Sequence, residues 1–559
     1  APAEIICNPE MKAQSRNLSA VKYGGLAEFR QLDESEFDTD KARAIIPRMC
    51  KDADGILKED DVCVKACGAL LGYIRQTQKR ELDYIRPGRS DGDTMLIDSN
   101  AAKTLELLTA ASGKKSGSVY AAINKTQTGM GARLLGKRLA APSADENVIN
   151  ARLDGVEELY LNRLLRDEIT EALSGISDIE RISTRIAYGS ITPKECVTLA
   201  VSLGNIVPLK KALSGCRSEL LASLHKSLDT MEDVAAVIRA AISDEPSAFV
   251  RDGGVIRDGY NKELDEYRAI SKDSKSLLAR IEAEQKERTQ IKNLRIGYNS
   301  VFGYYIEVPK SQSANVPYDY VRKQTLANAE RYIIEELKTL EDKILHAEDK
   351  ALALEQQLFT QLIRTLSTHC DRLLCAASVI AEADVTCSNA AIAAKYKYTR
   401  PSVSAASHEI KIKEGRHLIV ERMNTETFVP NDTYINDSDS RTMIITGPNM
   451  AGKSVYMRQV ALIVILAQAG AFVPAESAEL CITDRVFTRV GASDDLHTGR
   501  STFMVEMSEV SYILENATDR SLILLDEVGR GTATYDGLSI AWAIVEYLSS
   551  SFRAKTLFS

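Results

Sequence analysis

The segment from Gly447 to Ser454 reads GPNMAGKS and fits the pattern G-x-x-x-x-G-K-[ST]. Its glycines let a loop fold with successive N–H groups pointing inward, toward phosphate oxygens. An apolar run at Thr442–Thr446 precedes the loop, and a helix whose N-terminal end adds positive field is predicted from about Lys453. The pattern therefore predicts a nucleotide site in which Lys453 reaches the β- and γ-phosphates and Ser454 ligates Mg²⁺. The residues expected to line it are Gly447, Pro448, Asn449, Met450, Ala451, Gly452, Lys453 and Ser454.

A second element, from Ser521 to Glu527, reads SLILLDE. An apolar run that ends in two acids is typical of a central strand that delivers carboxylates to the carboxyl edge of a parallel sheet, where ligands bind. Asp526 is expected to share the Mg²⁺, and Glu527 to polarise the attacking water. The two elements together indicate nucleotide hydrolysis.

Between these elements lies DDLHTGRSTFMVEM, from Asp494 to Met507. Gly499 interrupts the chain, and Ser501 or Thr502 can cap the helix that follows. A helix N-terminus with a free hydroxyl is an anion site, and across a dimer it could reach the γ-phosphate held by a partner. A plain helix cap is the alternative interpretation.

The elements around these motifs are mostly helical from about Asp61 onward. One helix is predicted over Val62–Gln76, with its inward face formed by Val62, Ala66, Leu70 and Ile74. Another is predicted over Val148–Arg166, with its inward face formed by Ile149, Leu153, Val156, Leu159 and Leu161. From about Tyr398, short apolar runs alternate with amphipathic helices, which favours a parallel sheet.

Two further features stand between the helical and the α/β parts. Residues Leu294–Val308 read LRIGYNSVFGYYIEV and predict a strand, a turn and a strand, inserted in a helical domain. A long helix is predicted from about Asn328 to Thr365, about 55 Å in length, and its pattern continues past Leu366 toward Ile380. Its heptad stripe consists of Leu337, Leu340, Ile344, Ala347, Ala351, Leu354 and Leu358.

Length and composition limit the class of protein. With 559 residues, 44% apolar and 26% charged, the chain predicts a globular protein of three to five domains. The longest apolar stretch, Val460–Ala471, is too short to span a bilayer. The ten cysteines lack paired zinc spacing and are expected to be reduced thiols. The sequence begins without Met and ends within a strand at Leu557–Ser559, so we expect a piece of a longer protein.

The motifs GPNMAGKS, DDLHTGRSTFMVEM and LLDEVGRGTATYDG together resemble the MutS family of DNA mismatch-repair ATPases, relatives of the ABC ATPases. The segments YNSVFGYYIEV, RYIIEELKTLEDKIL and EGRHLIVE resemble the same family, so the similarity covers nearly the whole chain. It implies an ATP hydrolase that uses ATP and Mg²⁺. It also implies that Ser501 contacts the γ-phosphate of the opposite subunit, that Asn449 senses the nucleotide state and that Phe428 stacks on adenine.

The resemblance implies a multidomain α and α/β fold. Long helical levers would form a core with an inserted small β clamp, followed by a P-loop, ABC-type ATPase domain with a mostly parallel sheet. Residues 1–81 would be the C-terminal part of a connector domain, and residues 82–264 and 326–395 the two parts of the core. Residues 265–325 would be the DNA clamp, and residues 396–559 an ATPase domain truncated at its C-terminus.

The clamp interpretation agrees with the distribution of charge. The chain carries −8 overall, which excludes a uniformly basic nucleic-acid binder, but the segment from Lys286 to Lys323 carries +4. Contacts there would be to phosphates, so they would not depend on base sequence. A solvated basic face is the alternative. The residues expected to bind DNA are Lys292, Arg295, Lys310, Arg322 and Lys323.

The sequence departs from the family pattern at both ends. Mismatch sensors of the family carry an N-terminal domain with a Phe-x-Glu element, for which ESEF at Glu34–Phe37 does not qualify. The His-bearing switch after the last strand and a C-terminal helix–turn–helix are also not found. We therefore expect ATPase and clamp machinery without the mispair reader.

Two functions fit this pattern. The partial connector sequence and the helix containing Leu71–Ile74 favour a mismatch-repair ATPase that clamps duplex DNA and couples ATP binding and hydrolysis to mismatch recognition and repair signalling. The alternative is a MutS-related recombination or junction clamp that does not read mismatches. A general ABC-type or chromosome-structuring ATPase is disfavoured, because GRSTF at Gly499–Phe503 replaces an LSGGQ-type signature. The implied partners are double-stranded DNA, a second copy in a homodimer with composite ATP sites, and a MutL-type repair protein. The implied location is the cytoplasm, on the nucleoid, with no membrane.

Overall fold

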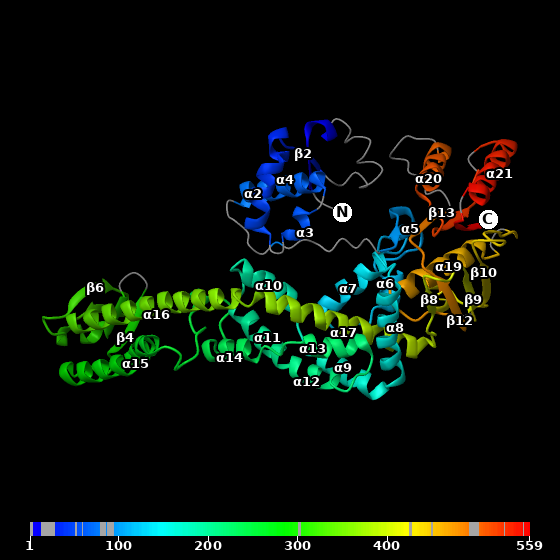
Figure 1. Ribbon diagram of the computed structural model, residues 1–559. Helices are drawn as coiled ribbons and strands as arrows, with labels where there is room; N and C mark the ends of the chain where they lie inside the picture. Colours follow the sequence, from blue (N-terminus) through cyan, green and yellow to red (C-terminus); the bar gives the residue numbers. More distant parts are fainter. Residues whose placement is uncertain are drawn as a thin grey trace. The chain divides into compact units, whose positions relative to one another are not determined.

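The computed structural model describes residues 4–12, 28–50, 53–58, 60–78, 85, 94–299, 303–423, 427–448, 451–490, 502–529, 532–551 and 553–559. The chain forms two compact units, Ala1–Gly92 and Asp93–Ser559, and each is described by itself. Figure 1 labels many of the helices and strands of both units.

The first unit combines a small parallel sheet with helices. Strand β1 (Glu4–Cys7) pairs with β2 (Glu28–Gln31). Helix α2 (Thr39–Met49) packs against α4 (Asp61–Gln78), and a Cβ at Gly68 of α4 would lie 2.6 Å from the Cα of Ala42 in α2. The two helices therefore meet where neither carries a large side chain. The helices of this unit are η1 (Glu34–Phe37), α2 (Thr39–Met49), α3 (Asp54–Leu57) and α4 (Asp61–Gln78).

Helix α4 lies where a helix was predicted, but it buries another face. Val62 and Leu70, predicted to point inward, are 70% and 46% exposed, and Ala66 is exposed as well, so the prediction was wrong at these positions. Ile74, the fourth predicted residue, packs against the buried core of this unit. The buried face carries Val64 and Leu71 instead. Several stripes of this helix are apolar, and the stripe that includes Gly68 is buried because it allows the closest approach to α2.

The second unit begins with β3 (Leu96–Ile97) and continues as a body of short helices. Most of them begin at a residue whose side-chain oxygen accepts a backbone N–H bond, as Asp98, Ser118 and Thr192 do, so the sequence itself marks their starts. The helices are α5 (Ser99–Thr104), α6 (Val119–Ile123), α7 (Gly129–Ala140), α8 (Glu146–Leu161), α9 (Arg163–Ser174), α10 (Ile179–Ala187), α11 (Pro193–Gly204), α12 (Ile206–Leu213), α13 (Glu219–Ser227), α14 (Glu232–Ala241) and η2 (Val250–Asp252).

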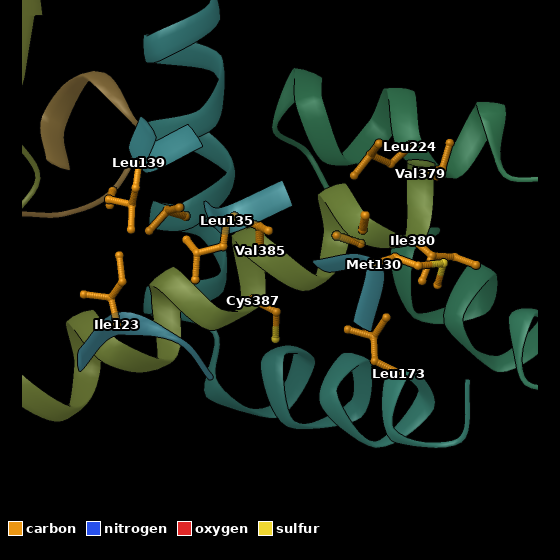
Figure 2. Close-up of a cluster of buried hydrophobic side chains, with 14 of the residues drawn as sticks. Ile123, Met130, Leu135, Leu139, Leu173, Leu224, Val379, Ile380, Val385 and Cys387 are labelled. Atoms are coloured by element: carbon orange, nitrogen blue, oxygen red, sulfur yellow. The ribbon is translucent and has the colours of Figure 1, made fainter. Parts of the chain in front are cut away.

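Helix α17 (Cys370–Tyr396) is the central element of this body. It contacts α7, α8, α9, α10 and α13 and is buried along most of its length. In Figure 2, Val385 and Ile380 of α17 lie among Leu135 and Met130 of α7 and Leu173 of α9. The helical body is therefore held together by apolar burial around one helix, at about 1.5–3 kcal/mol for each large side chain.

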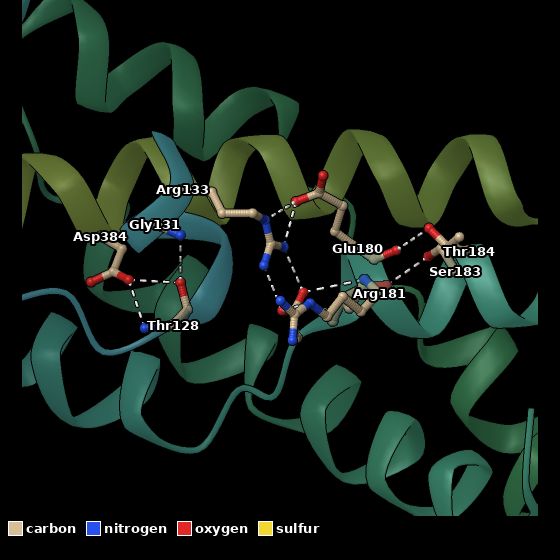
Figure 3. Close-up of polar contacts among 10 residues, drawn as sticks. Thr128, Gly131, Arg133, Glu180, Arg181, Ser183, Thr184 and Asp384 are labelled. Atoms are coloured by element: carbon tan, nitrogen blue, oxygen red, sulfur yellow. Dashed lines mark hydrogen bonds and ion pairs between the residues drawn. The ribbon is translucent and has the colours of Figure 1, made fainter. Parts of the chain in front are cut away.

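A buried carboxylate on α17 also fixes the start of α7. Asp384 accepts hydrogen bonds from the N–H of Gln127 (2.9 Å) and from the N–H and hydroxyl of Thr128 (2.8 and 2.6 Å). The Thr128 hydroxyl oxygen in turn accepts the N–H of Gly131. Figure 3 shows the bonds among Asp384, Thr128 and Gly131 beside the ion pair of Arg133 with Glu180. Arg133 also pairs with Asp178. Polar contacts thus set the register of the helices that apolar contacts hold together.

The helix predicted over Val148–Arg166 is two helices. Asn162 has φ −107° and ψ 87°, ends α8, and caps α9 by accepting the N–H of Leu165 at 3.2 Å. Four predicted inward residues, Ile149, Leu153, Val156 and Leu159, are buried as expected. Leu161 is 76% exposed because it lies at the break, so its prediction was wrong.

The predicted inserted β structure is confirmed. Between α15 (Lys262–Thr289) and α16 (Glu335–Ser367) lies an antiparallel sheet of strand order β4-β5-β7-β6. One face packs on α15 and α16 through a separate core that includes Ile306, Tyr332 and Leu337. The turn residues 300–302 lie outside the described residues. The strands are β4 (Arg295–Asn299), β5 (Gly303–Pro309), β6 (Val321–Thr325) and β7 (Ala329–Ile333), with η3 (Lys310–Asn315) between β5 and β6.

The long helix starts later than predicted. Residues Ala329–Ile333 form β7 between β5 and β6, so helix α16 begins at Glu335 rather than Asn328, and the sheet extends past the expected clamp end at residue 325. Alternate residues of β7 are buried, and this two-residue period matches a strand rather than a helix. The helix ends at Ser367, close to the predicted end at Thr365, and α17 starts separately at Cys370. The apolar pattern continues across this break as predicted, since Leu366 and Ile380 are both buried.

The stripe predicted on the long helix is present in most positions. Leu337 and Ala347 are buried, and the side chain of Ile344 lies outside the description. The remaining positions are partly buried against neighbouring elements: Leu340, Ala351, Leu354 and Leu358.

One carboxylate fixes α16 where it passes the helical body. Glu355 is 2% exposed and accepts the N–H groups of Gly254 (3.1 Å) and Val255 (2.9 Å). It also pairs with Arg268 of α15 at 2.6 Å. Arg268 further donates to Asp258 (2.6 Å) and to the carbonyl oxygen of Ile256 (2.8 Å). Glu355 therefore joins both long helices to the loop that precedes α15.

The C-terminal part contains the predicted parallel sheet. Its strand order is β11-β15-β14-β13-β3, and all of these described pairs are parallel. Strand β14 is buried throughout. A second, mixed sheet has the order β10-β9-β12-β8. The elements are β8 (Ser402–Ser404), β9 (Ile410–Gly415), α18 (Val420–Met423), β10 (Asn431–Ile435), β11 (Thr442–Ile444), α19 (Lys453–Gln468), β12 (Ser477–Cys481), β13 (Arg485–Val490), α20 (Thr502–Asn516), β14 (Leu522–Asp526), α21 (Thr534–Ser551) and β15 (Lys555–Phe558).

Helix α19 joins this part to the helical body. Its residues from Val460 to Gln468 are buried, and they share one apolar core with α7, α8 and α17. Gln468, the polar residue within the longest apolar stretch, donates to the carbonyl oxygens of Ser143 (2.8 Å) and Thr483 (3.0 Å). Gln468 thus bonds α19 to the segment after α7 and to the segment after β12.

Two stretches of the described chain, Pro193–Leu213 and Cys370–Tyr396, are long and apolar enough to cross a membrane by length and composition alone. In the structure 44% of the first window and 78% of the second are buried. The second is the central helix of the helical body, and the first is divided between α11 and α12, so packing accounts for their apolar character.

Candidate nucleotide and DNA sites

The glycine-rich loop lies between β11 and α19, as the sequence predicted. Hydrogen bonding of the Ile445 N–H to Phe558 (2.7 Å) carries the strand pairing up to the loop. Gly452 has φ 91°, which favours glycine, and α19 starts directly after it at Lys453. The Lys453 ammonium donates to the carbonyl oxygen of Gly447 at 2.7 Å, so its side chain folds back along the loop. Asn449 and Met450 lie outside the described residues.

The structure brings together the two predicted metal-binding residues. Ser454, in the first turn of α19, donates a hydrogen bond from its hydroxyl to Asp526 Oδ2 at the end of β14. Asp526 is 2% exposed, and its Oδ1 has no hydrogen-bond partner among the described residues. A buried carboxylate oxygen without a donor, beside a hydroxyl, is a suitable pair of hard oxygen ligands for Mg²⁺.

Glu527 follows Asp526 in a constrained backbone conformation. Its φ is 57°, in the left-handed region, where a residue other than glycine costs about 1–3 kcal/mol. Its N–H donates to the carbonyl oxygen of Ser559 at 2.9 Å, and the Ser559 N–H donates to Leu525 at 2.8 Å. Pairing with the chain after β15 thus holds Glu527 in this conformation, at the carboxyl edge of the sheet.

Comparison with known proteins identifies the family. A model described as MutS domain III matches residues 100–390, and one described as MutS domain V matches residues 443–559. The chain belongs to the MutS family. Three relatives share the name DNA mismatch repair protein MutS. The relative from Solibacter usitatus is 48% identical over 89% of this chain, and the match spans 58% of that relative's length. The relative from Caldicellulosiruptor bescii is 49% identical over 90% of this chain, and the match spans 59% of its length.

The third relative, from Acetivibrio thermocellus, is 44% identical over 100% of this chain and 65% of its own length. The chain therefore spans about three fifths of these MutS proteins. Their shared name favours the mismatch-repair interpretation of the sequence over the junction-clamp alternative.

Two residues of the nucleotide site remain predictions. Ser501 and the preceding residues 491–500 lie outside the described residues, and α20 begins directly after them, at Thr502. Phe428 is half-buried ahead of β10, and its stacking on an adenine ring is a prediction only.

A residue that the sequence interpretation missed lies in α20. Glu506 is buried, and its carboxylate accepts the N–H of Gly529, two residues after Glu527. Arg489 of β13 lies 3.8 Å from the same carboxylate. The signal was available, because Glu506 is the single charged residue in the apolar run Phe503–Met507.

The candidate DNA-binding residues lie on the inserted β sheet and its borders. Lys292, Arg295, Lys310 and Lys323 are exposed, and no ion pair to them is present among the described residues. Arg322 is exposed and lies 3.4 Å from Glu330. An acid outside the segment partly neutralises the +4 charge, since Lys286 pairs with Glu282 at 2.6 Å. Arg288 pairs with Asp319 at 2.8 Å, and this acid is already included in the +4.

The sheet face directed away from α15 and α16 is polar. Arg295, Glu307 and Arg331 align across β4, β5 and β7, and Arg331 pairs with Glu307 at 3.1 Å. The Tyr305 ring covers Gly297, where a Cβ would lie 2.8 Å from its Cζ, and the Arg331 guanidinium lies 4.3 Å above that ring. Tyr305 is therefore fixed flat on the sheet, where it covers the glycine.

Proposed function

We propose that this MutS-family chain is the ATP-hydrolysing and DNA-clamping part of a mismatch-repair protein. The observation that carries the proposal is the contact between Ser454 and Asp526, with Glu527 beside it. It unites the end of a glycine-rich loop with two acids at the carboxyl edge of a parallel sheet, where ligands bind. The curated relatives are named DNA mismatch repair protein MutS, which supports the biological role.

We assign the residues of the proposed site as follows. The backbone N–H groups of residues 447–452 and the ammonium of Lys453 would bind the phosphates of ATP. Ser454 and Asp526 would hold Mg²⁺, which neutralises charge on the phosphates when bound. Glu527 would orient and polarise the attacking water. The remaining proposed roles belong to Phe428 on adenine, Asn449 as a sensor and Ser501 on the γ-phosphate of a partner subunit.

We also propose the division of labour along the chain. Residues 1–81 would belong to a connector, and the helical body with α16 and α17 to the lever core. The sheet β4–β7 between α15 and α16 would be the clamp, holding duplex DNA by phosphate contacts from Lys292, Arg295, Lys310, Arg322 and Lys323. Residues 396–559 would form a P-loop, ABC-type ATPase that pairs with a second copy. Proposed partners are duplex DNA, a second copy in a homodimer with composite ATP sites, and a MutL-type protein. The proposed location is the cytoplasm, on the nucleoid.

The test is nucleotide binding by a Lys453→Ala variant. We expect fluorescent ATP to bind the unaltered protein, and Lys453→Ala to abolish detectable binding, because the loop then lacks its charge for the β- and γ-phosphates. Lys194→Ala is the matched control, since Lys194 is an exposed lysine on α11 of the helical body. Equal ATP affinity of Lys453→Ala and the control would refute the assignment of the site.

A further inference from the structure

Helix α20 is bonded to the segment after β14 through one buried carboxylate. Glu506 is 3% exposed. Its Oε1 accepts the N–H of Gly529 at 2.6 Å, and its Oε2 lies 3.8 Å from the guanidinium of Arg489 on β13. A short hydrogen bond from a backbone N–H to a buried carboxylate is among the stronger bonds available to a protein. Glu506 therefore fixes the distance between α20 and the segment that contains Gly529.

This segment also contains Glu527. Gly529 lies two residues further on, with φ 91°, and a Cβ there would lie 2.7 Å from the carbonyl oxygen of Gly537 in α21. Glu527 itself is bonded through its N–H to Ser559 after β15. The segment is thus held by the end of the sheet, by α21 and by Glu506. Of these three anchors, Glu506 is the one that belongs to α20.

We infer that Glu506 is a positioning residue for hydrolysis, which transmits the position of α20 to Glu527 through the N–H of Gly529. The inference rests on the proposed function of Glu527. Helix α20 starts directly after Ser501, for which we propose contact with the nucleotide of a partner subunit. A shift of α20 when that nucleotide binds or leaves would move Gly529 and thereby the Glu527 carboxylate. Each ATP site would in this way respond to the occupant of the other.

The same helix provides a matched control. Glu509, one turn after Glu506, also lies beside Arg489, with 3.1 Å between Oε2 and Nε. Its Oε1 accepts a bond from the side-chain amide of Asn100 in α5 at 2.9 Å, so it anchors α20 away from Gly529. The two glutamates share Arg489 and the helix, and they differ in whether they bond the segment of Glu527.

The experiment compares Glu506→Ala, Glu506→Asp, Glu506→Gln and Glu509→Gln in the whole chain. Single-turnover hydrolysis at saturating ATP, the affinity for fluorescent ATP and amide hydrogen exchange of the peptide containing Gly529 are measured. In Glu506→Ala, and in Glu506→Asp, whose shorter side chain cannot span the distance, hydrolysis should slow about tenfold or more. ATP affinity should change by less than about twofold, and the Gly529 amide should exchange faster.

The remaining two variants separate positioning from general stability. Glu506→Gln keeps an oxygen that can accept the Gly529 N–H, so its hydrolysis should stay within about threefold of the unaltered protein. Glu509→Gln should do the same and leave the Gly529 amide protected. Melting temperatures are recorded for all variants, and if Glu506→Ala does not fold, the ratio of rates between Glu506→Gln and Glu506→Asp decides.

Three outcomes overturn the inference. These are unchanged hydrolysis in Glu506→Asp, equal slowing in Glu509→Gln, and a fall in ATP affinity that accounts for the whole effect. Hydrolysis by the unaltered protein with no response to Glu506 rejects this inference alone. No hydrolysis by the unaltered protein rejects the proposed function, and the inference with it.

Discussion

Replacing Glu355 with Ala should loosen the junction between the long helices and the helical body. The carboxylate accepts the N–H groups of Gly254 and Val255 and pairs with Arg268, and it is almost fully buried. Its removal leaves two backbone donors without an acceptor and takes from Arg268 Nη2 one of its two acceptors. The alanine side chain offers these donors no acceptor in place of the carboxylate, because it ends at Cβ.

The size of the loss follows from these contacts. A buried donor left unpaired costs about 1–3 kcal/mol, and removal of one partner of a buried ion pair costs about 3–5 kcal/mol. The Arg268 side chain is 23% exposed and keeps its bonds to Asp258 and Ile256, so water and these partners compensate for part of the loss. We therefore expect about 3 kcal/mol, which makes the open state of this junction about 100-fold more populated.

Amide hydrogen exchange of the peptide containing Gly254 and Val255 measures how often the junction opens, and urea unfolding measures the stability of the whole protein. Asp349→Ala is the control, because Asp349 is an exposed acid on the same helix. Exchange should accelerate about 100-fold in Glu355→Ala and stay unchanged in the control. An acceleration below about fivefold, or an equal one in Asp349→Ala, would show that Glu355 does not hold the junction.

Four other predictions concern the proposed site, the clamp and pH. Glu527→Gln should keep ATP binding and slow single-turnover hydrolysis by about 100-fold or more; a rate within a few-fold of the unaltered protein would exclude Glu527 as the water-polarising residue. Four basic residues of the proposed clamp are replaced together by alanine: Lys292, Arg295, Arg322 and Lys323. This change should weaken binding to every duplex about equally and reduce the salt dependence of binding, whereas a loss of binding to one base sequence only would contradict the clamp. Residues 1–559 should bind a homoduplex and a G·T-mismatched duplex within about 0.5 kcal/mol in competition titrations, because phosphate contacts do not report base pairing, and a tenfold preference for the mismatch would reveal a reader. Burial, together with the charge of Arg458, lowers the pKa of His417 to about 4. Between about pH 6.5 and pH 4, His417 is protonated in the unfolded chain but stays neutral in the folded chain. The free energy of unfolding should therefore fall as the pH is lowered through this range, by about 2 kcal/mol at pH 5. Urea unfolding of His417→Asn should lack this contribution, and an identical pH dependence in both proteins would assign it to other groups.

The nucleotide site was the part most open to prediction from sequence. The glycine-rich loop, the apolar strand and the two acids carry local signals, and the sheet then brings Ser454 and Asp526 into contact. Roles that depend on a ligand or a second subunit, such as those of Ser501 and Phe428, remain predictions. Glu506 stands out as the charged residue in an apolar run, but its role could not be predicted, because its partner, the N–H of Gly529, has no signature in sequence.

The errors share a physical cause. The inward face of α4, the break at Asn162 and the strand β7 are decided by packing or pairing with distant segments, and local periodicity does not contain that information. Val62 lies on a stripe that could have been buried, and Ala329–Ile333 could have extended α16. In each case contacts with another element determined the outcome.

Strand β3 has a consequence for the synthesis of this protein. Leu96 and Ile97 pair with Arg485 and Val486 at the edge of the nucleotide-site sheet, and the Leu96 N–H donates to Asp484 at 2.8 Å. A ribosome adds about 5–20 residues per second, so β3 would leave it roughly 20–80 seconds before its partner strand. During that time its backbone groups would be open to pairing with other chains. A gene piece that begins at residue 396 would face the opposite difficulty, since β13 would form with its outer edge uncovered. Such a piece should be prone to aggregation, and supplying residues 94–104 as a separate peptide should restore its solubility.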